Sequence, residues 1–249
     1  MINPTRYLMN IKEPELDAKI FRFISFESLC EILLFKKLTL PKINTWDDPY
    51  ENYLLKMDIN KVSDAHKTIP ISPALQELKN RLYGQCWTLN PESDALWRIY
   101  SSNSRGVRIS TTLRKLYEVI NVSESKNDSI CLGKVNYQSL DKIEQYLTSL
   151  KYVTEVNANS IFESILIKRN EFLHENEIRI IYAAGLDFEK DIKQYDIDIN
   201  NFINSIMFDP RISKRYETLY RAAIETIGFK NEVSKSILYE FKQLSINIS

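Results

Sequence analysis

The sequence predicts an α+β fold, in which an irregular, mostly antiparallel sheet is flanked by helices in a single domain over residues 1–249. Short runs rich in β-branched and aromatic residues alternate with segments whose apolar residues recur at helical spacing. The intervals between these runs are short, and no repeat, linker or low-complexity tract divides them. Hydrophobic residues make up 44% of the chain and charged residues 27%, with 5 Gly and 8 Pro, which is typical of a chain that buries a core.

The first half of the chain predicts strands and helices in alternation. Residues 19–24 have strand composition, and Ser25 is placed to cap a helix that ends near Lys36 and Lys37. The sequence next predicts an extended run at 38–41, a turn at 43–51, a surface connection at 60–73, a helix at 74–82 stopped by Gly84, a strand at 85–89, a helix at 95–100, a strand at 107–110 and a helix at 111–120.

The second half continues the alternation, with a clear strand at 177–183. The other elements predicted here are a strand at 130–137, helices at 139–150 and 156–169, a strand at 200–207 and a helix at 213–226. We therefore expect a core over residues 19–183 and a C-terminal extension of helix and strand over 196–249.

The charge balance and the number of cysteines indicate which partners and which cellular compartment the protein is expected to have. Lys plus Arg and Asp plus Glu each number 33, so no net field attracts nucleic acid or anionic lipid. Cys30, Cys86 and Cys131 are far apart, and with only His66 and His174 beside them no conventional zinc site is expected. The sparse cysteines, the lack of a signal-peptide pattern and the lack of a run of roughly 18 apolar residues predict a cytoplasmic protein.

Several enzyme classes lack their sequence signals. The phosphate-loop and dinucleotide glycine fingerprints and the nucleophile elbow are absent. A Ser-His-Asp or Cys-His arrangement would need His66 in a loop or His174 in a polar turn, and both are expected to be ordinary surface residues. These absences weigh against kinases, GTPases, Rossmann enzymes and α/β-hydrolases.

A few polar residues stand where strands begin or end, which suits a pocket. Glu177 lies where a polar turn meets the strand at 177–183, with Glu175 two residues earlier. A solvated turn glutamate with Glu175 as its neighbour is the ordinary explanation of this position. Arg22, Thr88 and Tyr100 occupy similar strand or helix ends, although Arg22 also fits the outward face of an alternating strand.

These residues fall within five short motifs, which are Phe21-Arg22-Phe23, Trp46-Asp47-Asp48-Pro49-Tyr50, Cys86-Trp87-Thr88, Leu96-Trp97-Arg98-Ile99-Tyr100 and Glu175-Asn176-Glu177-Ile178-Arg179. In this order the motifs resemble a known bacterial family, the domain-of-unknown-function 2971 family. The resemblance spans roughly residues 19–183 and departs from the family pattern at Asp47, Thr88 and Phe172, where the family usually has Asn, Ser and Trp.

The same layout is similar, more distantly, to ADP-ribosyltransferase-fold toxins. Those enzymes split NAD and carry an Arg or His on the first core strand, a Ser, Thr or Tyr on a second strand followed by a helix with an aromatic, and a catalytic Glu at a later strand. The resemblance implies a split sheet and a transferase that uses NAD as substrate without a metal. It implies Glu177 and Glu175 as catalytic residues, and Arg22, Trp87, Thr88 and Tyr100 as NAD-binding residues.

The chemistry of NAD cleavage suits those residue types. Breaking the nicotinamide bond develops positive charge on the ribose, which a carboxylate such as Glu177 stabilises. The planar guanidinium of Arg22 would engage a phosphate or the adenosine-side ribose, and Trp87 or Tyr100 would stack on nicotinamide. Thr88 would support Glu177 by a hydrogen bond. Glu175, two residues earlier and hence on the same face of an extended strand, would orient or deprotonate the acceptor.

The resemblance implies a macromolecular acceptor, with RNA or DNA favoured over protein. Such an enzyme would be a toxin or phage-defence effector with an antitoxin or other inhibitory partner, acting away from membranes. A local basic patch that could hold nucleic acid is matched by the ordinary alternative of a solvated helix face. The residues of this patch are Lys168, Arg169, Arg211, Lys214, Arg215 and Arg221.

Two other classes of function remain open. A non-catalytic nucleotide- or partner-binding regulatory module would keep the same groove without turnover. A magnesium-dependent nuclease would use Asp47, Asp48 and Glu51 with the Glu175 and Glu177 pair, because carboxylate oxygens are preferred ligands of that ion.

Overall fold

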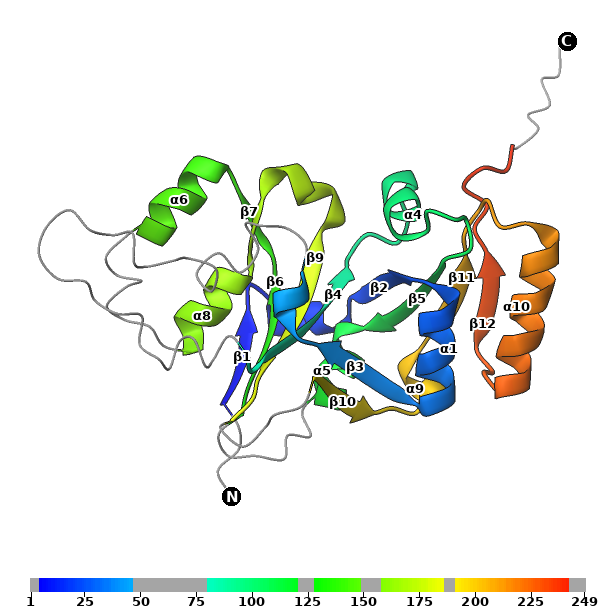
Figure 1. Ribbon diagram of the computed structural model, residues 1–249, viewed down its shortest axis with the longest axis horizontal. Helices are drawn as coiled ribbons and strands as arrows, with labels where there is room; N and C mark the ends of the chain where they lie inside the picture. The colour runs from blue at the N-terminus through cyan, green and yellow to red at the C-terminus, as the bar shows by residue number, and fades with distance from the viewer. Residues whose placement is uncertain (1–4, 47–79, 121–127, 149–157, 186–190, 242–249) are drawn as a thin grey trace, which may run out of the picture.

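An eight-stranded sheet forms the centre of the computed structural model, which describes residues 5–46, 80–120, 128–148, 158–185 and 191–241 (Figure 1). Its strands, in spatial order, are β1 (Thr5–Met9), β6 (Ser129–Lys134), β9 (Glu177–Ala183), β4 (Leu82–Thr88), β2 (Lys19–Ile24), β5 (Val107–Thr112), β11 (Ser205–Phe208) and β12 (Glu232–Lys235). The outermost pairs, β1–β6 and β11–β12, are parallel, and the pairs between them are antiparallel. The predicted α+β class and mostly antiparallel sheet are confirmed.

The sheet is split between β4 and β2. Pairing between these two strands consists of Phe21 opposite Thr88. By contrast, β4 pairs with β9 along its whole length, from Leu82 opposite Ala183 to Thr88 opposite Glu177, and β2 pairs with β5 along its whole length. The sheet therefore has one half made of β1, β6, β9 and β4 and another made of β2, β5, β11 and β12.

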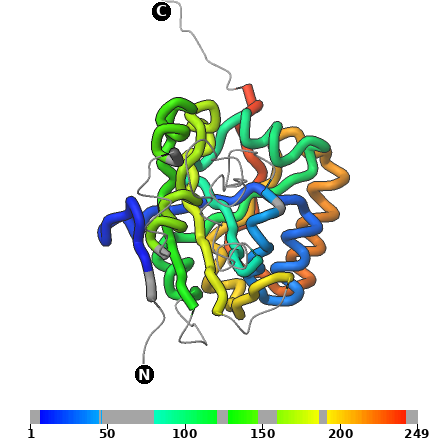
Figure 2. Tube along the Cα trace, turned by 60° about the vertical axis from the view of Figure 1, so that its left-hand side comes forward, coloured from blue at the N-terminus to red at the C-terminus, as the bar shows by residue number. Residues whose placement is uncertain are grey.

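Helices and short sheets cover the two halves. The α-helices are α1 (Phe26–Phe35), α4 (Asp94–Tyr100), α5 (Leu113–Ile120), α6 (Leu140–Thr148), α8 (Ala158–Ile165), α9 (Ile199–Phe202) and α10 (Lys214–Ile227). The 3-10 helices are η1 (Glu13–Asp17), η2 (Ile43–Thr45) and η4 (Asn170–Glu175), and the small two-stranded sheets pair β3 (Lys37–Pro41) with β10 (Ile192–Asp196) and β7 (Asn136–Gln138) with β8 (Ile167–Arg169). Figures 1 and 2 show α1 and α10 side by side at the half that holds β2, while α6 and α8 lie beside the other half.

Local sequence explains where the helices begin and end. The Ser25 hydroxyl accepts a hydrogen bond from the Ser28 amide at 3.1 Å and caps α1, as predicted. The helix stops where Lys36 takes a left-handed conformation with φ of 52°. At the end of α10, Gly228 has φ of 93° and its amide closes the last turn, which is a common glycine C-cap.

Two large apolar cores and a small cluster of Phe23, Leu96 and Trp97 pack on the described part of the sheet. The larger core packs α1, α5 and α10 against the strands, and its members include Leu29, Leu33, Trp87 and Ile180. The smaller core packs Ile161, Phe162, Ile165 and Leu166, on or just after α8, against Cys131 and Ile181 of β6 and β9. The larger core spans both halves of the sheet, since Trp87 lies on β4 and Ile180 on β9, so apolar packing joins the halves where β2 and β4 share little backbone pairing.

The structure corrects the prediction around Gly84. Leu82–Thr88 is one strand, β4, and Gly84 lies inside it rather than stopping a helix. A Cβ at Gly84 would lie 2.8 Å from a methyl carbon of Ile43 and 3.0 Å from the Trp46 ring. Glycine is needed there for close approach in a sheet and not for a helix end. Most of the predicted helix at 74–82 lies outside the described residues.

Two other segments were assigned wrongly in part, and three strands were missed. The predicted helix at 156–169 is α8 followed by strand β8, and the predicted strand at 200–207 is the short helix α9 followed by β11. Strands β1, β10 and β12 were not predicted from the sequence. Short apolar runs do not distinguish a buried strand from a helix, and the missed strands lie at sheet edges, where the apolar pattern is weaker.

Candidate active site

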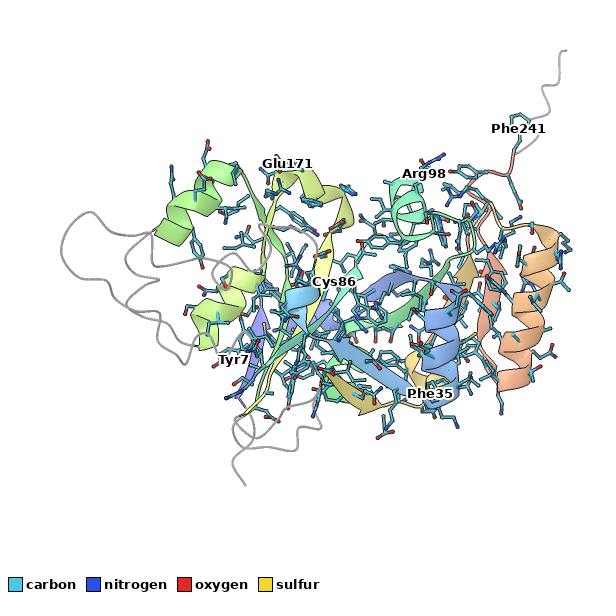
Figure 3. All side chains as sticks on the ribbon, viewed as in Figure 1. Tyr7, Phe35, Cys86, Arg98, Glu171 and Phe241 are labelled. Atoms are coloured by element: carbon cyan, nitrogen blue, oxygen red, sulfur yellow. The ribbon has the colours of Figure 1, made fainter. Side chains whose placement is uncertain are left out.

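A cleft of about 380 Å³ opens at the split in the sheet. Its walls come from β2 and β4, from α4, from β8, and from the turn that joins η4 to β9. Figure 3 shows Cys86, one of the lining residues, near the middle of the molecule, below η4 with Glu171 and α4 with Arg98. All six residues predicted for the site border this cleft, namely Arg22, Trp87, Thr88, Tyr100, Glu175 and Glu177.

Glu177 is the first residue of β9 and is 5% exposed. Its Oε1 accepts a hydrogen bond from Lys168 Nζ at 3.2 Å, and its Oε2 accepts one from Arg179 Nε at 2.8 Å. Burial by itself would raise the pKa of Glu177, but the Arg179 and Lys168 cations outweigh burial and hold that pKa at about 2. Glu177 therefore carries a fixed negative charge at neutral pH.

Glu175 reaches the same place from a different element. It ends η4, and the left-handed Asn176, with φ of 44°, turns the chain before β9 begins. The expectation that both carboxylates extend from one face of a strand is thus wrong, because the turn intervenes. Glu175 Oε2 accepts from Lys168 Nζ at 2.5 Å and Oε1 accepts from the Tyr100 hydroxyl at 3.2 Å. Burial and then the Glu177 charge raise the pKa of Glu175.

Thr88 holds the backbone of this turn. Its hydroxyl donates to the Glu175 carbonyl at 2.5 Å and accepts from the Asn90 amide at 3.0 Å. The Asn90 side chain in turn donates to the His174 carbonyl at 2.7 Å. The predicted hydrogen bond from Thr88 to the Glu177 carboxylate is not formed, because the Thr88 hydroxyl donates to the Glu175 carbonyl instead.

Arg22 is the cation on the opposite wall. It lies on β2, is partly exposed, and makes no ion pair or hydrogen bond within the described part of the chain. Burial lowers the pKa of Arg22 to about 10, and the nearby Cys86 and Tyr100 oppose this shift. The guanidinium is therefore charged at neutral pH and available to an anion.

The two predicted aromatic residues differ in exposure. The Trp87 ring is 2% exposed, its Nε1 donates to Gln85 Oε1 at 2.8 Å, and it packs edge-on against Phe202. Stacking of Trp87 on a ligand is therefore excluded, because the ring points into the core. Tyr100 is 43% exposed at the end of α4 and is the predicted aromatic that a ligand can reach.

Two charged residues of the site were not predicted from the sequence. Lys168 was considered only as part of a surface patch, yet it is 7% exposed and bridges both carboxylates. Arg179 is fully buried and pairs with Glu177. The sequence does carry a signal for Arg179. Side chains two residues apart in a strand lie on the same face of the sheet, so the predicted strand at 177–183 puts Arg179 on the face of Glu177.

The structure removes part of the predicted basic patch from the surface. Lys168 is buried in the cleft. Arg211 pairs with Asp209 and donates to two main-chain carbonyls, while Arg221 pairs with Glu217 on its own helix. Lys214 and Arg215 remain exposed at the start of α10, so the basic charge at this surface is smaller than the sequence predicts.

The remaining predictions concern a magnesium site, other metal sites and membrane-spanning helices. Asp47, Asp48, Glu51 and His66 lie outside the described residues, so the proposed magnesium set is not placed. Within the described ranges, no three His, Cys, Asp or Glu side chains gather as metal ligands would. The described helices include none with the length and apolar character that crossing a bilayer requires.

Comparison with known proteins gives few matches. No curated protein matches the sequence. Similar solved structures include DarT of Thermus sp. 2.9 in complex with ADP-ribosylated ssDNA (TM-score 0.41, 11% identity, covering 92% of this chain and 98% of that one). The complex of the same protein with NAD+ has a TM-score of 0.40 and 11% identity, covering 88% of this chain and 96% of that one. The family model described as protein of unknown function DUF2971 matches residues 96–180, and over that segment it confirms the family resemblance that the motifs indicate.

Proposed function

We propose that this protein is an NAD-dependent ADP-ribosyltransferase that modifies a macromolecular acceptor, with nucleic acid, and RNA in particular, favoured over protein. One observation carries the proposal. A charged arginine without a partner in the described chain, Arg22, faces the same cleft as the buried carboxylates Glu175 and Glu177. NAD brings a pyrophosphate anion and a ribose that becomes cationic as nicotinamide leaves, so it needs one charge of each sign in one cleft.

The residues divide the reaction between them. Arg22 binds the pyrophosphate through its planar donors. Glu177, ionised by its two cationic neighbours, stabilises the positive charge that develops at the ribose C1′. The bond from C1′ to the nicotinamide nitrogen breaks, its electron pair leaves with neutral nicotinamide, and C1′ forms a new bond to the acceptor nucleophile. These steps call for no metal.

Glu175 is the candidate base for the acceptor. Its pKa is raised by burial and by Glu177, which makes its carboxylate a better proton acceptor than an ordinary glutamate. Tyr100 donates to Glu175 and is exposed at the cleft, so it both orients this carboxylate and offers a ring for nicotinamide to stack on. Thr88 contributes by fixing the Glu175 backbone and not by touching NAD.

Release of nicotinamide from NAD by the purified protein tests the proposal. The assay is run alone and with cellular RNA, DNA or protein fractions, and Glu177→Gln and Arg22→Met are compared with Glu217→Gln, which alters a glutamate on α10 paired with Arg221. We expect Glu177→Gln to lower kcat by roughly 100-fold or more and Arg22→Met to raise KM, while Glu217→Gln changes neither. Equal activity of Glu177→Gln and the control would contradict the assignment.

A second candidate function is favoured by the way Glu177 is held. Both of its oxygens contact cations and the residue is 5% exposed, an arrangement that would also suit a nucleotide-binding module without turnover. Such a module predicts NAD or nucleotide binding that Arg22→Met weakens, with no nicotinamide released in any mixture. Calorimetric titration beside the release assay separates the two functions.

The proposed biological role is that of a toxin or phage-defence effector restrained by an antitoxin or other inhibitory partner. A transferase that modifies nucleic acid without restraint would damage its own cell. Induced expression should therefore arrest growth for the wild-type chain and not for Glu177→Gln at equal protein level. Growth arrest that persists with Glu177→Gln would disconnect toxicity from this cleft.

A further inference from the structure

Lys168 occupies the part of the cleft wall that lies between the two carboxylates. It lies on β8 and its side chain is 6% exposed. Its Nζ is 2.5 Å from Glu175 Oε2 and 3.2 Å from Glu177 Oε1, and it lies 4.6 Å from the centre of the Phe172 ring. A single ammonium thus contacts an oxygen of each glutamate.

The two glutamates need a shared cation because of how the chain brings them together. Glu175 and Glu177 stand on either side of the left-handed Asn176, so the turn directs two buried negative charges at one point. Like charges this close raise the pKa of one carboxyl and push both side chains apart. Lys168 opposes both effects at once.

The other groups around this pair each hydrogen-bond to one of the two glutamates, and the Glu175 and Glu177 side chains also interact directly with one another. Arg179 binds Glu177 Oε2, and the Tyr100 hydroxyl binds Glu175 Oε1. The Tyr137 hydroxyl accepts a hydrogen bond from the Glu177 main-chain amide. Among these groups, Lys168 is the one that touches both carboxylates.

We infer that Lys168 is a positioning residue that holds the Glu175 and Glu177 carboxylates side by side at the wall of the cleft, with both available as anions. Its consequence for turnover rests on the proposed function. Without the ammonium, Glu175 keeps its burial and its charged neighbour but loses its cation, so it would bind a proton at higher pH. A base that is protonated cannot accept the acceptor's proton, and activity would then fail at the acidic end of the pH range.

The test compares Lys168→Met with Lys193→Met. Lys193 is also buried, at 6% exposure, but lies on β10 against Tyr182 and Tyr195, so its removal measures the general cost of losing a buried lysine. Lys168→Arg restores a cation, and Lys168→Gln removes the charge while keeping a hydrogen-bond donor if the methionine variant does not fold. Circular dichroism establishes that each variant used is folded.

The first readout does not depend on activity. Carbon-detected NMR of protein labelled at the glutamate carboxyl carbons follows the titration of Glu175, assigned with Glu175→Gln. We expect the Glu175 midpoint to rise by about 1–3 pH units in Lys168→Met or Lys168→Gln, to stay unchanged in Lys193→Met, and to return toward wild type in Lys168→Arg. An unchanged midpoint in Lys168→Met overturns the inference.

The second readout is the pH profile of nicotinamide release. The acidic limb should move upward with the Glu175 midpoint. While the midpoint lies between about pH 6 and pH 8.5, each rise of one pH unit should lower activity near pH 6 by up to about tenfold and leave activity near pH 8.5 much less affected. A profile in Lys168→Met that is merely scaled down, as in Lys193→Met, would mean a structural role only and would overturn the inference. If the wild type releases no nicotinamide but the midpoint moves as expected, the proposed function fails while the hold of Lys168 on both carboxylates stands.

Discussion

Replacing the fully buried Arg179 by methionine should cost more stability than any surface arginine substitution in this chain. The Arg179 Nε and Nη2 lie 2.8 and 2.7 Å from Glu177 Oε2, and Nη1 donates to the Ile165 carbonyl at 2.6 Å. Its guanidinium carbon lies 4.7 Å from the centre of the Trp46 ring. Arg179→Met removes all of these contacts and leaves one oxygen of a buried carboxylate without its cation.

The expected size of the loss follows from that burial. Breaking a buried ion pair from one side costs about 3–5 kcal/mol, because the remaining charge stays out of water. For a chain of this length, such a loss lowers Tm by roughly 6–20 °C. Lys168 still pairs with the other oxygen of Glu177 and partly balances its charge, so we expect a loss of stability near the lower end of the range of about 3–5 kcal/mol.

The matched control is Arg114→Met. Arg114 binds both oxygens of Asp17, at 2.7 and 3.1 Å, with a side chain that is 39% exposed. The substitution is the same and each arginine places two nitrogens on one carboxylate, although Arg114 reaches both oxygens of Asp17 and Arg179 reaches one oxygen of Glu177. Burial is the main difference, so solvent should screen most of the loss at Arg114. Urea titration of both variants by circular dichroism measures the two free energies of unfolding.

Equal losses for the two arginines would refute this reasoning. A double variant sharpens the test, since Arg179→Met combined with Glu177→Leu removes both partners of the pair. It should lose less stability than Arg179→Met alone, because no carboxylate is then left without its guanidinium. A double variant less stable than the single one would mean that packing of the arginine, and not the pair, carries the stability.

Two further predictions concern acid stability and close packing. The pKa of Glu177 is held at about 2 against 4.5 in an unfolded chain, so its pair contributes about 3 kcal/mol that is fully present above pH 4.5 and is lost as pH falls toward 2. Chemical denaturation across this window should show a shallower pH dependence in Glu177→Gln than in wild type. Gly133→Ala should cost about 1–3 kcal/mol, because a Cβ there would lie 2.3 Å from a methyl carbon of the buried Leu166. In Gly228→Ala the space is open and the cost, about 1 kcal/mol, comes from the φ of 93° alone, so thermal melts of the two variants separate crowding from backbone strain.

The elements that the sequence predicted well are those whose pattern is local. The strand at 177–183 and the helix capped by Ser25 follow from composition and capping, and both are present as β9 and α1. The segment at 156–169 was assigned wrongly because Ile165, Leu166 and Ile167 form an apolar run that suits either a helix or a strand. Residues 167–169 form a strand because β8 pairs with β7, and this pairing depends on residues distant in the sequence.

The candidate site was predictable in its members but not in their orientation. Motif order placed Arg22, Tyr100 and Glu177 around one cleft, as the structure shows. The direction of the Trp87 ring depends on Phe202, more than a hundred residues away, and the place of Lys168 depends on the strand that replaced a predicted helix. Side-chain direction follows from strand register, which tertiary pairing sets.

The charges at the cleft are hard to explain by stability alone. Lys168, Glu175, Glu177 and Arg179 are all buried within one connected network, with two charges of each sign. Burying four ions costs several kcal/mol for each, and apolar packing of the same volume would be equally stable or better. The network lies where the sheet splits, opposite Arg22, which the described chain leaves without a counter-ion. A catalytic site that stabilises a developing cation needs ionised carboxylates, which explains why these charged residues are buried here. Carboxyl groups with shifted pKa values are expected at such sites.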